Sequence, residues 1–91
     1  MSNKSRIGQI RSLLEASFAP SRLEIEDDSW KHAGHAGAAG HGGGHFSIVI
    51  AADAFSGRSR LQRHRMVMQV LQPMFRDEIH ALSIRAEAPG E

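Results

Sequence analysis

Histidines and arginines are the residues of this 91-residue chain whose types and spacing could do chemistry. Three histidines lie in a glycine-rich stretch: His32, His35 and His41. Four arginines lie within eight residues: Arg58, Arg60, Arg63 and Arg65. His80 stands apart from both groups, late in the chain. Imidazole nitrogens bind transition metals, whereas clustered guanidinium groups bind phosphates. The two groups therefore indicate two different activities, metal ligation and nucleic-acid binding.

The chain contains no cysteine, and this restricts its metal chemistry. Disulfide bonds are excluded, as is any thiolate site built from this chain alone. Sulfur ligands would have to come from another molecule. The loop histidines could instead bind zinc, nickel or copper by themselves. However, six glycines between Trp30 and Gly44 make ordering costly, so such a site would be weak without a template.

The elements that must position these residues follow from hydrophobic periodicity. Apolar residues recur every three or four positions over 4–18, which predicts a helix that Pro20 ends. Alternation of apolar and polar residues predicts strands over 22–27, 45–51 and 79–86. His45 opens the second strand, where we interpret it as structural or solvated.

A second helix is expected to begin near Ser59. Ser59 and Gln62 fit the capping-box pattern, in which each side chain satisfies a backbone amide of the other residue. An apolar stripe then continues through Leu61, His64, Met68, Leu71 and Phe75. On this stripe His64 points into the core and is interpreted as a structural histidine. Pro73 should kink or interrupt the helix, because proline lacks the amide hydrogen.

The predicted order, α-β-β-α-β, indicates one α+β domain over residues 1–91, with both helices on one face of a three-stranded sheet. Within it we expect a flexible loop over 31–44 and a frayed tail over 87–91. The net charge of +1 gives no strong attraction to nucleic acid or membrane. No apolar run reaches the length of a membrane span, so the expected location is the cytoplasm. No nucleophile motif, carboxylate pair or phosphate loop indicates an enzyme.

Three segments resemble the BolA-like family in order and spacing. They are HFSIVIAADAF from His45, FSGRSRLQRHR from Phe55 and EIHALSI from Glu78. The resemblance extends from the first helix to about Ala86. It implies the class II KH-like arrangement for the α+β fold.

The resemblance also implies a partner and a cofactor. BolA-like proteins form heterodimers with monothiol glutaredoxins and share a [2Fe–2S] cluster with them and with glutathione. The implied ligands are His80, in EIHALSI, and His32, because DSWKH is similar to the run that carries the loop ligand in histidine-type members. The loop is longer than usual here, so His35 and His41 are substitutes for His32. No cluster is expected in the isolated protein.

The alternative function is DNA binding. Members of the family are also described as transcriptional regulators, and the turn and helix over 57–65 could bind phosphates through Arg58, Arg60, Arg63 and Arg65. Against this, a KH module needs a GXXG clamp, and the chain reads SGRS over 56–59, with one glycine. The arginines could equally form a solvated helix start or contact glutaredoxin.

Overall fold

The computed structural model describes residues 3–28, 44–75 and 77–91, and the predicted order of elements is confirmed there. The main elements are α1 (Asn3–Phe18), β1 (Arg22–Asp27), β2 (Gly44–Ala51), α2 (Arg60–Leu71) and β3 (Ile79–Glu87). Two short 3-10 helices, η2 (Asp53–Phe55) and η3 (Gln72–Met74), flank α2. The expected flexible loop, with His32, His35 and His41, falls almost entirely outside the described residues.

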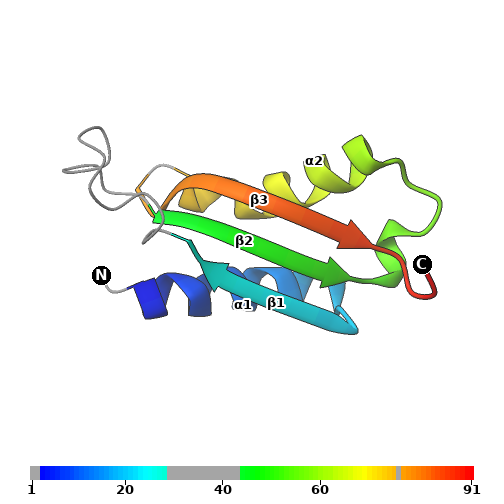
Figure 1. Ribbon diagram of the computed structural model, residues 1–91, viewed down its shortest axis with the longest axis horizontal. Coiled ribbons are helices and arrows are strands. Elements are labelled where there is room, and N and C mark those ends of the chain that lie inside the picture. Colours follow the sequence, from blue (N-terminus) through cyan, green and yellow to red (C-terminus); the bar gives the residue numbers. More distant parts are fainter. Residues whose placement is uncertain (1–2, 29–43, 76) are drawn as a thin grey trace.

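The sheet is mixed, with strand order β1-β2-β3. β1 pairs with β2 in the antiparallel sense, and β2 pairs with β3 in the parallel sense. Both helices lie behind the sheet in Figure 1, as the sequence predicts, so none of the helices that the structure describes covers the opposite face, called the open face below. A parallel pair needs a long crossover, and α2 provides it here. As a result, β2 and β3 begin at the same end of the sheet.

The core lies between the helices and one face of β2. Phe46, Ile48 and Ile50 are buried there, and they alternate with half-buried residues that face the open side. From the helices, Ile10, Leu14, Val67 and Leu71 complete the buried cluster. Phe55 in η2 is also fully buried, with its ring centre 5.0 Å from that of Phe18. Each such side chain contributes about 1.5–3 kcal/mol by leaving water.

The buried face of α2 is not the one predicted from the apolar stripe through Leu61 and His64. Leu61 is 56% exposed and His64 is exposed, so the prediction of a core His64 is wrong. The buried face instead runs through Val67 and Leu71 to Met74 in η3. Leu71 belongs to both helical rows, and the competing row through Val67 is the one that packs on the core.

Pro73 interrupts α2 as predicted. The α-helix ends at Leu71, and Pro73 lies inside the tighter helix η3 that follows. Proline at this early position of a helical turn has no amide hydrogen to leave unsatisfied. The amide of Glu78 then donates to the Met74 carbonyl at 2.8 Å, one residue before β3 begins.

The predicted capping box is present at the start of α2. Ser59 Oγ accepts from the Gln62 amide at 3.1 Å, and Gln62 Oε1 accepts from the Ser59 amide at 2.8 Å. Ser59→Ala should therefore lower the free energy of unfolding by about 1 kcal/mol. Urea unfolding followed by circular dichroism measures this, with Ser56→Ala in the preceding exposed turn as the control. Equal losses in the two variants would show that the cap contributes nothing.

Candidate functional site

His80 lies at a β-bulge near the start of β3. Gly44 pairs with Ile79, but the next residue, His45, pairs with Ala81, so His80 is the extra residue of β3. A bulge changes which face the following residues occupy. Ile79 is buried whereas His80 is exposed. His80 therefore does not share the core face of Leu82, which strict alternation would require.

His45 lies against His80 on the open face of the sheet. Their ring centroids are 5.1 Å apart, and the rings are tilted by 50°. From the sequence His45 is interpreted as structural or solvated, whereas the structure places it beside His80, the predicted ligand. His45 and His80 open two strands that follow one another in the sequence. Their proximity could be predicted only with the knowledge that these strands are parallel neighbours in the sheet.

Hydrogen bonds hold the strand ends that carry the two histidines. The Asp28 amide donates to the His45 carbonyl at 2.7 Å, and the Gly44 amide donates to the Glu78 carbonyl at 3.2 Å. Arg6 of α1 contacts the Glu78 carboxylate at 2.9 Å, with both side chains largely shielded from solvent. The backbone on either side of the histidine pair is therefore tied to neighbouring elements.

Two imidazoles, those of His45 and His80, meet at this end of the sheet. Within the ranges 3–28, 44–75 and 77–91, no group of three or more histidine, cysteine or acidic side chains could hold a metal. The pair His45 and His80 thus offers two imidazoles, fewer than the four ligands of a tetrahedral site or an iron–sulfur cluster. Further ligands would have to come from the loop histidines, water or another molecule.

The arginines predicted to bind phosphate surround a second feature, an open groove of about 770 Å³ beside α2 and β3. Its charged or titratable lining residues are Arg58, Arg60, Arg63, His64, Arg85, Glu87 and Glu91. Three of the four predicted arginines are thus brought together, and Arg65 does not line the groove. Arg85 was missed because it comes from β3, far from the arginine-rich segment in sequence.

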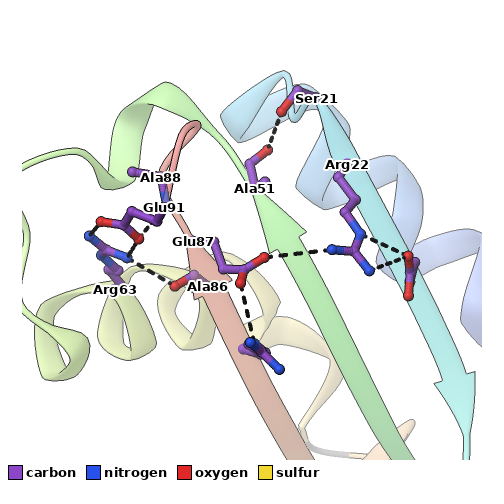
Figure 2. A network of polar contacts seen from close by, with 10 residues as sticks. Ser21, Arg22, Ala51, Arg63, Ala86, Glu87, Ala88 and Glu91 are labelled. Atoms are coloured by element: carbon purple, nitrogen blue, oxygen red, sulfur yellow. Dashed lines mark hydrogen bonds and ion pairs between the residues drawn. The ribbon is translucent and has the colours of Figure 1, made fainter.

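Arg63 is the most constrained arginine of the groove (Figure 2). Its two terminal nitrogens each lie 2.6 Å from a carboxylate oxygen of Glu91. Nη1 also donates to the Ala86 carbonyl at 3.1 Å, and Nε donates to the Arg58 carbonyl at 3.0 Å. Arg63 therefore joins the start of α2 to β3 and to the residues that follow it.

Glu91 is held by this contact, whereas the sequence predicts a frayed tail over 87–91. Glu87 is the last residue of β3, and Ala88 is buried. Hydrogen bonds from Arg63 and then from the Ala88 amide lower the pKa of Glu91 to about 2. The ionised carboxylate is thus the favoured form in the folded protein.

The pKa of the Glu91 carboxyl should be about 2 in the wild type and should rise toward its usual value of 4.5 in Arg63→Gln, where the hydrogen bond from the Ala88 amide remains. Because the folded pKa is lowered, the stability that this contact adds is complete above about pH 4.5 and is lost as the pH falls through 2. Carbon-detected NMR titration of the Glu91 side chain measures both values. Arg60→Gln, at another lining residue, is the control and should leave the wild-type pKa. A pKa near 4.5 for Glu91 in the wild type would contradict the contact between Arg63 and Glu91.

The fold and the site define a small α+β domain with a mixed sheet, two imidazoles on its open face and an arginine-lined groove. The family model described as BolA-like protein matches residues 14–91. The chain belongs to this family. The BolA domain of SufE1 from Arabidopsis thaliana has the same fold, with a TM-score of 0.81 and 42% identity over 93% of each chain. The predicted BolA-like arrangement is thereby confirmed.

Two relatives differ in how much of their own length matches this chain. SufE-like protein 1, chloroplastic/mitochondrial, from A. thaliana is 44% identical in an alignment 91 positions long, which covers 96% of this chain and 24% of that protein. The chain thus spans about a quarter of that relative's length. The DNA-binding transcriptional regulator BolA of Escherichia coli K12 is 36% identical over 76 residues, 84% of this chain and 69% of the relative.

The longest helix that the structure describes is α1, with 16 residues. Across the part of the chain that the structure describes, no helix combines the length and apolarity needed to span a bilayer.

Proposed function

We propose that this protein is a non-enzymatic adaptor that binds a monothiol glutaredoxin and shares a [2Fe–2S] cluster with it and with glutathione. Its role would be iron–sulfur trafficking or iron-status signalling in the cytoplasm. The observation that carries the proposal is the exposed His80, which stands beside a second imidazole on anchored strand ends. A chain without cysteine can contribute no thiolate, so the partner and glutathione would contribute the sulfur ligands.

His80 is the proposed ligand from β3, and His32 is the proposed ligand from the loop, with His35 and His41 as substitutes. Imidazole in place of thiolate makes a [2Fe–2S] cluster less negative and raises its reduction potential. Only a deprotonated imidazole can bind a metal, so ligation should weaken as the pH falls. Both effects suit a protein that receives and releases a cluster rather than one that retains it.

The test is a titration of a cluster-loaded monothiol glutaredoxin with the wild-type protein, followed by visible absorption and circular dichroism. We expect a spectral change that saturates at one adaptor per glutaredoxin. His64→Ala is the matched control, because it removes an exposed histidine that lines the arginine groove and is not part of the His45–His80 pair. This variant should titrate like the wild type. An unchanged spectrum with the wild type would rule out the shared cluster.

DNA binding is the second candidate function. It is favoured by the groove, where Arg58, Arg60 and Arg85 gather beside Arg63. The E. coli relative is a DNA-binding regulator, which makes the same activity reasonable here. The Glu91 carboxylate opposes it, because it already occupies Arg63 and adds negative charge to the groove.

Fluorescence anisotropy with a labelled DNA duplex, repeated at several salt concentrations, tests this second candidate. Loss of two phosphate contacts in the double variant Arg58→Gln/Arg60→Gln should weaken binding and reduce the salt slope by about 2. Arg11→Gln, an exposed position on α1, is the control. Glu91→Gln should tighten binding because it frees Arg63. Absence of salt-dependent binding by the wild type would exclude this function.

A further inference from the structure

The spacing of His45 and His80 matches that of two imidazoles on one metal ion. A bound nitrogen lies about 1.1 Å from its ring centre and about 2.0–2.1 Å from zinc, so two ligands at a tetrahedral angle have ring centres roughly 5 Å apart. The observed separation of the two centroids is 5.1 Å. Aromatic rings in direct contact have the same range of separations and tilts, so zinc binding is the measurement that separates the two arrangements.

The backbone around His45 is fixed independently of any ligand. Its carbonyl accepts from the Asp28 amide at 2.7 Å, and the Asp28 carboxylate accepts a hydrogen bond from the hydroxyl of Ser47, two residues further along β2. Sites built on strands hold their ligands more closely than sites on loops, and less entropy is lost when the metal binds. The glycine-rich segment that carries His32 has no such advantage in its composition.

The bulge gives His80 a comparable setting. It inserts His80 between Ile79, which is buried, and Ala81, which pairs with His45. The extra residue directs the imidazole toward the open face, where strict alternation would have placed it on the core side. Bulges commonly redirect a side chain beside a functional site.

We propose that His45 and His80 form a two-imidazole metal site contributed by β2 and β3, in which His45 is a ligand. The site takes a borderline transition-metal ion that prefers imidazole, such as Zn²⁺ or Co²⁺, and leaves the remaining coordination positions to water or to a partner. In the shared cluster this inference rests on the proposed function, and there His45 would take the position beside His80 that is assigned above to His32.

Isothermal titration calorimetry with Zn²⁺ alone tests the site in the full chain. Binding by the loop is removed first, in the background variant His32→Asn/His35→Asn/His41→Asn. This background should bind one zinc ion per chain. Adding His45→Ala or His80→Asn should weaken zinc binding at least tenfold, whereas adding His64→Ala should leave it unchanged. Circular dichroism shows whether each variant is folded. If His45→Ala does not fold, His80→Asn still tests the site, because His80 is exposed.

No zinc binding by the background variant, or equal binding after His80→Asn, would overturn the proposal. Cobalt absorption spectra give a second readout, because loss of an imidazole ligand changes the visible bands. The background variant is also titrated into the glutaredoxin cluster. A full spectral change there supports His45 as the second cluster ligand. Zinc binding without any cluster response, in this variant and in the wild type, would retain the metal site and reject the glutaredoxin adaptor.

Discussion

His80→Ala should abolish the spectral change that the wild-type protein causes in a glutaredoxin-bound [2Fe–2S] cluster. The variant removes the imidazole that the proposal requires, and no cysteine in the chain can replace it. Because His80 is exposed, its loss should change the free energy of unfolding by no more than about 0.5 kcal/mol. The measurement is circular dichroism in the visible range at increasing ratios of adaptor to glutaredoxin.

Two further observations separate ligand loss from loss of the complex. Size-exclusion chromatography with the cluster-free glutaredoxin shows whether His80→Ala still associates. His64→Ala, another exposed histidine, should keep the full spectral change. A complete change with His80→Ala would contradict the ligand assignment, whatever the behaviour of the loop variants.

Phe55→Ala should lower the free energy of unfolding by about 3–5 kcal/mol. Phe55 is fully buried and packs on Phe18 of α1, so truncation leaves a cavity in the core. For a domain whose total stability is about 5–15 kcal/mol, this loss is large enough to populate the unfolded state. Urea unfolding at 25 °C, followed by far-ultraviolet circular dichroism, measures it.

Leu61→Ala is the matched control for this prediction. It removes a large apolar side chain of α2 that is 56% exposed, so its cost should stay near 0.5 kcal/mol. A similar loss in the two variants would show that the core is not where the structure places it. The comparison also tests the corrected face of α2, since the sequence had assigned Leu61 to the core.

The helices and strands could be predicted because their patterns are local. Alternation gave the bounds of β1 without error, and the capping box at Ser59 placed the start of α2 within one residue. The buried face of α2 could not be chosen locally, because the rows through His64 and through Val67 both include Leu71. Only packing against α1 and the sheet distinguishes them.

The candidate sites were predictable by residue type but not by arrangement. His80 could be singled out from its segment, whereas its contact with His45 depends on a parallel register and a bulge that the sequence does not reveal. Arg63 was likewise recognised as part of an arginine cluster. Its clamp on Glu91, 28 residues away, and the approach of Arg85 both arise from tertiary structure.

The hydrogen bond from Arg63 to Ala86 has a consequence for self-association. β3 lies at an edge of the sheet, and the Glu87 carbonyl accepts from Ala52, so the neighbouring Ala86 carbonyl faces outward. Unpaired backbone groups on an edge are a template for a strand of another molecule. Arg63 covers this carbonyl at 3.1 Å, and the exposed Arg85 places charge on the same strand. Arg63 therefore reduces the unpaired backbone that this edge offers to another molecule, and variants made in the groove to probe ligand binding should also be compared with the wild type for self-association.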